Sequence, residues 1–339
     1  MLTQRQFDFF HNILRVFITR DMDDRITERV NRLLARSDLK ELFCNKADID
    51  SLFPEFHVQA KRKNISDRSQ SDFWCVYISA LFEHGDVDVA YDLLRAMLKF
   101  DWGMKVVAPY LALSSRAHEL GAHNAVTEKA SVVFDSLNRS IANRVFESMV
   151  SAGKSVALVG NGPGDNRKKL GKEIDSHDVV IRINNYARGK YEEDFGRKTD
   201  IWVKATFLGI DHDCVRYPAG LVFYADELTR RAMFPGYLEA MYEETKRIPV
   251  ECFAPGFRKG LTRHYGGAPT TGFTLIQWLK GLHIRYLDVY AFSFLDSITS
   301  KKYLSFDGSS PDATAHDLLG ERELLSLLPW DGRRLWIET

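Results

Sequence analysis

Glycine and asparagine residues follow a short apolar run near the middle of the chain. The run Ser155 to Val159 has the composition of a strand that is buried on both faces. Gly160, Asn161 and Gly162 come directly after it. Glycines let backbone N–H groups approach an anion closely, and an asparagine amide adds a further hydrogen-bonding group. This spacing predicts a turn that holds a phosphate or a nucleotide ribose.

A dinucleotide-binding fold is the main alternative interpretation of this turn. Its fingerprint needs G-x-G-x-x-G and an acidic residue about 20 residues later. Asp165 stands in place of the third glycine, and the next expected strand, Asp178 to Ile183, leads to Asn184 and Asn185 instead of an acid. An NAD-dependent oxidoreductase is therefore a less favoured alternative, and a purely structural turn is another.

A second group of donors stands at Thr270, Thr271 and Gly272, ahead of the helical pattern Phe273 to Gly281. The N-terminus of a helix is electrostatically positive and presents N–H groups, so hydroxyls there can join in binding an anion. The alternative is that Thr270 or Thr271 caps the helix and binds nothing else.

His316 is the candidate general base. Thr314 and Asp317 resemble a capping box ahead of the apolar helix Leu318 to Leu328, which puts His316 in the first turn. The positive end of a helix disfavours imidazolium and keeps the ring neutral, as a base requires. An ordinary surface histidine is the alternative.

Glu321 would lie about 140° around the helix from His316, so we expect Glu321 to be structural and to anchor a nearby loop.

Three ordered segments resemble the sialylmotifs of the sialyltransferase family. VALVGNGP with LGKEIDSHDVVIRINN and EEDFGRKTDIWV is similar to the large motif, PTTGF at 269–273 to the small one, and HDLLGE at 316–321 to the very small H-x4-E motif. The resemblance covers about residues 155–328. It implies a CMP-sugar donor and favours sialic acid as the sugar, whereas the departures from the family described below leave Kdo open. The acceptor would be a hydroxyl on a surface glycan or a lipid-linked glycan.

The resemblance also implies roles for single residues. The donor-binding set is Gly160, Asn161, Gly162, Asn184, Thr270, Thr271 and Gly272. Within it, Asn161 and Asn184 would contact the phosphate and the nucleotide. His316 would be the catalytic base. A further His-Tyr pair of the family has Lys302 and Tyr303 as its counterpart here, so Lys302 would supply positive charge at the leaving group.

The chain departs from animal members of that family, whose large and small motifs are tied by a disulfide. Lys154 or Ser155 and His283 stand near the positions of those cysteines. The cysteines that are present show neither a C-x-x-C pair nor metal-ligand spacing, which is typical of thiols in a reducing compartment. They are Cys44, Cys75, Cys214 and Cys252. We therefore expect a bacterial, cytoplasmic relative.

Composition excludes several partners. The 46 basic and 46 acidic residues cancel, so no overall field draws the chain to nucleic acid or to acidic membranes. No apolar run approaches the roughly 18 residues of a spanning helix.

The D-x-D triplets are too frequent to indicate a metal, and we expect metal-independent transfer without a cofactor. Basic residues near the expected crevice would pair with the sugar carboxylate or lie on the solvated surface. They are Arg182, Lys204, Arg258 and Arg263.

Strands and helices must position these groups, and from residue 155 they alternate. The expected strands are Ser155 to Val159, Val179 to Ile183, Ile201 to Val203, Leu221 to Tyr224, Val250 to Phe253 and Tyr286 to Phe292. This pattern predicts a doubly wound, largely parallel, Rossmann-like α/β sheet whose ligands bind at the carboxyl ends of the strands. Residues 151–339 would form this catalytic domain.

Residues 1–150 are expected to form an all-helical accessory domain. Turns at 84–86 and 120–122 lie 36 residues apart, close to the period of tetratricopeptide-type repeats. Such a domain would bind a protein partner or brace the catalytic domain, and a generic helical bundle is the alternative. The helix Phe7 to Ile18 would pack in a core or lie peripherally on the inner face of a membrane. A non-catalytic adaptor with a degenerate nucleotide site is the alternative function.

Overall fold

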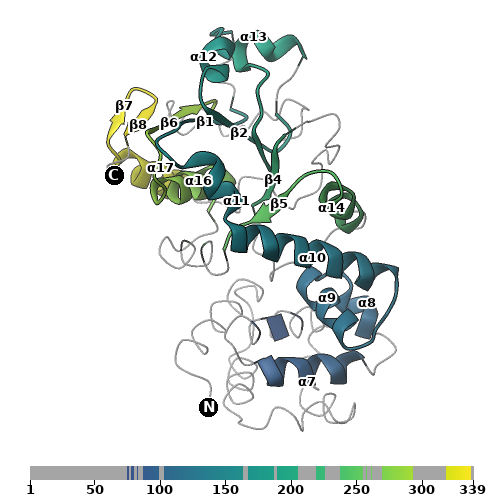
Figure 1. Cartoon of the computed structure of the whole chain (residues 1–339). Helices are drawn as coiled ribbons and strands as arrows, with labels where there is room; N and C mark the ends of the chain where they lie inside the picture. The colour runs from purple at the N-terminus through teal and green to yellow at the C-terminus, as the bar shows by residue number, and fades with distance from the viewer. Residues whose placement is uncertain are drawn as a thin grey trace, which may run out of the picture. The chain divides into compact units, whose positions relative to one another are not determined.

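The computed structural model describes part of the chain in detail (Figure 1). The described residues are 75, 78–79, 82, 87–98, 103–162, 167–186, 189–204, 219–225, 237–254, 257, 261, 269–292 and 318–336. The chain divides into two compact units, one of residues 1–131 with 229–233 and one of residues 132–228 with 234–339. The boundary expected near residue 150 stays a prediction.

The first unit is helical wherever it is described. Its helices are α7 (Val87–Leu98), α8 (Gly103–Val107) and α9 (Leu111–Glu119), which pack against one another, and the beginning of α10 (Ala125–Asn143). Gly121 adopts a φ of 89° in the turn after α9, a conformation that favours glycine. The helices expected before residue 74 and the turn at 84–86 lie outside the described residues.

The second unit is built on a sheet of eight strands in the order β5-β4-β3-β2-β1-β6-β8-β7. The strands are β1 (Ser155–Val159), β2 (Val179–Ile183), β3 (Ile201–Lys204), β4 (Leu221–Tyr224), β5 (Val250–Cys252), β6 (Tyr286–Tyr290), β7 (Trp330–Asp331) and β8 (Arg334–Trp336). The first six strands pair in parallel, and β8 and β7 add antiparallel to β6. The expected, largely parallel α/β sheet is confirmed.

The C-terminal hairpin of β7 and β8 was missing from the expected strands. The expected bounds of β1, β2 and β4 agree with the structure, and those of β3, β5 and β6 differ only at the carboxyl end. β6 stops at Tyr290, two residues before its expected end, because the chain turns there: Ala291 has a φ of 54°. Ala291 and Phe292 therefore lead out of the sheet instead of continuing it.

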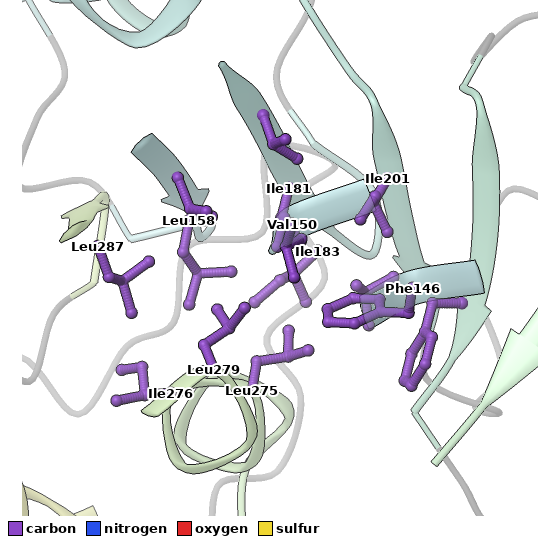
Figure 2. Packing of buried hydrophobic residues seen from close by; sticks show 14 of the residues in the cluster. Phe146, Val150, Leu158, Ile181, Ile183, Ile201, Leu275, Ile276, Leu279 and Leu287 are labelled. Atoms are coloured by element: carbon purple, nitrogen blue, oxygen red, sulfur yellow. The ribbon is translucent and has the colours of Figure 1, made fainter. Parts of the chain in front are cut away.

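One face of the sheet, here called the apolar face, packs against α11 (Val145–Val150), α16 (Thr271–Lys280) and α17 (Leu318–Ser326). Figure 2 shows Leu275 and Leu279 of α16 lying against side chains of β1, β2 and β6. Strand residues alternate between the two faces, so every second residue contributes to this core. The strand residues at its centre are Val156, Leu158, Ile181, Ile183, Ile201, Val203 and Leu287.

The opposite face, here called the charged face, lies against α12 (Gly171–Asp175), α13 (Glu192–Phe195) and α14 (Tyr237–Thr245). The 3-10 turn η2 (Gly189–Tyr191) leads into α13. Its small apolar cluster contains Ala157, Val159, Ile174, Val180, Phe195 and Tyr290. Beside this cluster, Arg182 and Lys204 are fully buried and Asp288 is nearly so. Helices on both faces make the sheet doubly wound.

The segments that contain Lys154 and His283 lie side by side. The Gly153 N–H donates to the carbonyl of His283 at 3.1 Å, and the Arg285 N–H donates to the carbonyl of Lys154 at 2.8 Å. Backbone hydrogen bonds therefore join the start of β1 to the start of β6. In the described part of the chain, Cys75 and Cys252 are buried thiols outside any disulfide.

Among the helices that the structure describes, none combines the length and the apolar character that crossing a bilayer requires.

Candidate functional site

The order of strand addition reverses between β1 and β6. From β1 the sheet grows through β2, β3, β4 and β5 on one side, and the chain then returns to place β6 on the other side of β1. In open α/β sheets, ligands bind outside the carboxyl ends of the strands at such a switch point. Gly160 follows β1 and Phe292 follows β6, so the candidate site lies there.

The Phe292 ring, which follows β6, lies close to the turn after β1 and to the start of α16. A Cβ added to Gly160 would lie 3.0 Å from the ring, and one added to Gly272 at the start of α16 would overlap it. Neither glycine has a positive φ, so both serve close packing. Gly160 packs against the Ala291 carbonyl and the ring, and Gly272 packs against the ring. From the sequence we expected Phe292 to be the last residue of a strand. The sequence shows that Phe292 is apolar, but it does not show that the ring lies between two glycines.

The N–H groups of the first two glycines of the turn point to β6. Gly160 donates to the carbonyl of Tyr290 at 2.9 Å, and Gly162 donates to the carbonyl of Ala291 at 2.6 Å. The expectation that these N–H groups face an anion is therefore not met. They instead fasten the turn to the neighbouring strand. Residues 163–166, which follow in the sequence, lie outside the described residues.

Asn161 contributes a side chain to the site. Its Nδ2 donates to the carbonyl of Ile183, the last residue of β2, at 2.9 Å, which fixes the orientation of the amide. Its Oδ1 is buried and has no hydrogen-bond partner among the residues that the structure describes. An unpaired buried acceptor costs about 1 to 3 kcal/mol. A ligand hydroxyl or amino group placed there would remove that cost.

Asn184 follows β2 and has an unusual backbone conformation. Its φ is 52°, in the left-handed region that asparagine tolerates better than most residues. Its N–H donates to the carbonyl of Val203 at 2.8 Å, and its carbonyl accepts from the indole Nε1 of Trp202 at 2.8 Å. The carboxyl ends of β2 and β3 therefore hold this residue from both sides.

Thr270 is the N-cap of α16. Its Oγ1 accepts from the N–H of Phe273 at 3.1 Å and donates to Oε2 of Glu321 at 2.7 Å. Its N–H donates to the other carboxylate oxygen of Glu321 at 2.5 Å. The Thr270 hydroxyl therefore donates its hydrogen bond to Glu321. The expectation that this hydroxyl binds the phosphate of the CMP-sugar is not met. The capping alternative accounts for Thr270.

Thr271 and Gly272 are the first two residues of α16, where N–H groups have no partner within the helix. They stay candidates for binding an anion. Glu321 lies at the same end, where its negative charge is stabilised by the helix dipole. Its carboxylate, 51 residues away in sequence, holds the start of α16 in place. The expected structural role of Glu321 therefore has a defined partner.

Two basic residues expected near the crevice are committed elsewhere. Arg182 is fully buried and donates to the carbonyls of Lys198 and Phe195 at 2.9 and 2.7 Å. Lys204 is also fully buried and forms an ion pair with Glu244. Both expectations, sugar-carboxylate pairing and solvated surface, are therefore wrong for these two residues. Arg258 and Arg263 lie outside the described residues.

The proposed catalytic base lies outside the described part of the chain. The same holds for Lys302 and Tyr303, so the roles of His316, Lys302 and Tyr303 stay predictions. Within the residues that the structure does describe, no group of three or more His, Cys, Asp or Glu side chains is arranged to hold a metal ion.

Part of the chain is similar to a known protein family. Residues 107–210 match the model of the family described as Glycosyltransferase family 29 (sialyltransferase). This segment contains β1, β2 and β3 and the turns that follow β1 and β2. The matched segment also carries Gly160, Asn161, Gly162 and Asn184.

Two curated relatives are similar over limited stretches. Alpha-N-acetylgalactosaminide alpha-2,6-sialyltransferase 1 of Gallus gallus is 30% identical over 135 residues, which cover 37% of this chain and 22% of that protein. Type 2 lactosamine alpha-2,3-sialyltransferase of Homo sapiens is 48% identical over 46 residues, 14% of each chain. The chain thus matches about a fifth or less of the length of these relatives. Both are animal proteins, and the expected bacterial origin finds no support in them.

Solved structures of mammalian sialyltransferases are similar at low identity. One, in complex with Gal-beta-1-3GalNAc-ortho-nitrophenol, is 17% identical, with a TM-score of 0.40 over 63% of this chain and 79% of that chain. A second is 19% identical, with a TM-score of 0.36 over 56% of this chain and 75% of that chain. TM-scores of this size do not establish a common fold.

Proposed function

We propose that this chain is a CMP-sugar-dependent glycosyltransferase that moves sialic acid from CMP-sialic acid to a hydroxyl group of a glycan acceptor. The observation that carries the proposal is the match of residues 107–210 to the sialyltransferase family. The matched segment includes the turn after β1 and Asn184 after β2, which lie at the sheet edge where such folds bind ligands.

The donor would bind with its nucleotide over the carboxyl ends of β1 and β2. The buried Oδ1 of Asn161 supplies an acceptor for a ligand hydroxyl or amino group. The N–H groups of Thr271 and Gly272, at the positive end of α16, supply donors for the phosphate or the sugar carboxylate. These groups are held in place before the donor arrives, so their orientation costs little at the moment of reaction.

In the transfer step, the acceptor oxygen forms a bond to the anomeric carbon of sialic acid as the bond from that carbon to the CMP phosphate oxygen breaks. His316 would take the proton of the acceptor hydroxyl, and CMP would leave with the bonding electron pair. Lys302 and Tyr303 would stabilise the charge that grows on the phosphate. Direct attack of this kind inverts the configuration of the anomeric carbon, and it needs no metal, because the leaving group is already an anion of low basicity.

Calorimetric titration of the full chain with CMP, CDP, UDP and NAD tests the donor class. We expect selective binding of CMP, weakened at least several-fold in Asn184→Ala. Asn143→Ala, at an exposed position in α10, is the matched control and should bind as the wild type does. Binding of NAD or UDP without CMP would show that the family resemblance misleads about the ligand.

Turnover assays then separate the possible sugars. CMP release with CMP-sialic acid, and not with CMP-Kdo, is the expected result with a galactose-terminated glycan as acceptor, and a preference for CMP-Kdo would replace sialic acid in the proposal. Transfer should persist in EDTA. CMP binding without turnover of either sugar would favour the nucleotide-binding adaptor instead. A cytoplasmic location, with the acceptor on a lipid at the membrane face, stays a prediction.

His316→Ala tests the catalytic base. We expect kcat to fall by roughly a hundred-fold or more, with CMP binding unchanged, because general base catalysis contributes a factor of that size. A variant with nearly full kcat would remove His316 from the mechanism and leave the donor assignment intact.

A further inference from the structure

Asn184 is held by two hydrogen bonds from the neighbouring strand, and the two bonds differ in kind. Its N–H donates to the backbone carbonyl of Val203, which is an ordinary continuation of the pairing of β2 with β3. Its carbonyl accepts from a side chain, the indole Nε1 of Trp202, at 2.8 Å. The first bond is available to any sequence, whereas the second depends on a tryptophan at this position.

The side-chain bond acts at a strained position. A non-glycine residue with a positive φ is stable only where its surroundings impose that conformation. The φ of Asn184 is 52°, and the bonds to its N–H and to its carbonyl fix both peptide groups that flank its Cα. Loss of the Trp202 bond would free the peptide group after Asn184. The direction of the Asn184 side chain would then vary.

Trp202 is itself held rigidly on the charged face. It is fully buried, and the Lys204 Nζ lies 3.8 Å from the centroid of its ring. Tyr186 packs edge-on against the ring, with the centroids 6.2 Å apart. A cation over a tryptophan ring is attracted by the negative face of the ring, so Lys204 stabilises this position of the indole.

The cation is fixed in turn by α14. Glu244 forms an ion pair with Lys204 and accepts a hydrogen bond from the hydroxyl of Tyr224. Lys204, Glu244 and Tyr224 are all buried. Contacts therefore run without a gap from Glu244 through Lys204 and the Trp202 ring to the backbone of Asn184.

We propose that Trp202 is a positioning residue for the nucleotide part of the donor. It acts through its indole N–H, which holds Asn184 in the conformation that presents this residue at the carboxyl end of β2. The inference rests on the proposed function, because it takes CMP as the ligand that Asn184 meets. Trp202 touches the peptide group of Asn184, and the proposal gives it no direct contact with the donor.

Trp202→Phe is the test, because it removes the N–H and keeps an aromatic ring under Lys204. The matched control is Trp330→Phe, which removes a similar bond in the C-terminal hairpin, from the Trp330 Nε1 to the carbonyl of Leu325 at 2.6 Å. Both variants lose one tryptophan hydrogen bond, and both are expected to melt at a lower temperature. Only Trp202→Phe should affect the donor.

We expect the Kd for CMP to rise about five-fold in Trp202→Phe, the effect of losing one typical hydrogen bond. The KM for CMP-sialic acid should rise by a similar factor, with kcat changed by less than about two-fold, since the bond acts on binding more than on the chemical step. Trp330→Phe should leave Kd, KM and kcat unchanged. A general loss of stability would not separate the two variants in this way.

Equal CMP affinity in Trp202→Phe and the wild type would overturn the inference and leave the proposed function standing. Absence of CMP binding by the wild type would overturn both. If Trp202→Phe does not fold, benzothienylalanine at position 202 replaces the N–H by sulfur in a ring of nearly the same shape. The same rise in Kd is expected for it, and an unchanged Kd would again refute the role of Trp202.

Discussion

The two faces of the sheet hold their buried acids in different ways. On the charged face, Asp288 accepts two hydrogen bonds from Arg334, each at 2.7 Å, and lies 3.1 Å from the Nε2 of His177. On the apolar face, Glu251 accepts a backbone N–H, that of Phe146 at the start of α11, at 2.8 Å. Both carboxylates are almost completely buried.

The pKa values of the two acids move in opposite directions. Burial works to raise the pKa of Asp288, but hydrogen bonds from Arg334 and His177 lower it to about 2. Burial raises the pKa of Glu251 to about 7, because the Phe146 N–H compensates only in part and Glu147 adds repulsion. Glu244, on the charged face, also has a raised pKa, since its burial outweighs Lys204 and Tyr224. The number and charge of the donors therefore decide whether burial is compensated.

The largest effect is expected from Glu244→Gln on the charged face. This change leaves the fully buried Lys204 without its counter-charge, and removal of one partner of a buried ion pair costs about 3 to 4 kcal/mol of the free energy of unfolding. Urea unfolding measures it. The double variant Lys204→Met with Glu244→Gln removes both charges and should recover most of the loss. Equal losses in the single and double variants would contradict an uncompensated lysine.

Leu279→Ala tests the apolar face by packing alone. Leu279 is fully buried in α16, against the strands, and its truncation should cost about 3 kcal/mol through lost burial and a cavity. Leu327, just after α17, is 77% exposed and provides the matched control. Leu327→Ala should change the free energy of unfolding by less than about 0.5 kcal/mol. Similar losses at the two leucines would mean that this core contributes little.

Asp288→Asn tests the compensated acid. Because the folded pKa is lowered from 3.8 to about 2, the carboxylate stabilises the fold above about pH 4, and this contribution is lost as the pH falls through 2. We expect the variant to be about 2 kcal/mol less stable at pH 7, a value below that for Glu244→Gln because Arg334 is 34% exposed and can turn to solvent. The difference should shrink in acid unfolding curves between pH 4 and 2. A stability difference between the variant and the wild type that does not change with pH would mean that the shape of the side chain matters, and that its charge does not.

Glu251→Gln should have the smallest effect and the opposite sign. A raised folded pKa means that stability is full below about pH 4.5 and is lost as the pH rises through about 7. Glutamine can still accept from the Phe146 N–H and cannot ionise. At pH 8 the variant should therefore be roughly 1 to 2 kcal/mol more stable than the wild type, and at pH 4 about equally stable. Thermal unfolding of the variant and the wild type at the two pH values tests this expectation. A variant that is less stable than the wild type at pH 8 would refute the raised pKa of Glu251.

Most of the sheet could be predicted from the sequence, because its parallel strands are short runs of buried apolar residues between turns. The strands that were missed, β7 and β8, have two and three residues, too few for a periodic pattern. A local signal was nevertheless present. Residues 332 and 333 form a two-residue hairpin turn, and glycine is typical of its first position, where Gly332 has a positive φ of 61°.

The site was only partly predictable. The glycines and asparagines after β1 and β2 are adjacent in the sequence to the strands that position them. The partners of Thr270 and Asn161 come from distant segments, Glu321 in α17 and Ile183 in β2. Residue type alone also cannot show whether a basic side chain is buried. Arg182 and Lys204 were expected to pair with a sugar or lie in solvent, and both are enclosed by the charged face.

The lengths of the outermost strands have a consequence for the protein in concentrated solution. The sheet ends in β5, with three residues, on one side and in β7, with two residues, on the other. An exposed edge recruits another chain through a row of unpaired backbone groups, and short rows recruit poorly. The long central strands, with five residues in each of β1, β2 and β6, all lie inside the sheet. Edge-to-edge aggregation of folded molecules is therefore disfavoured by the order in which the strands are laid down.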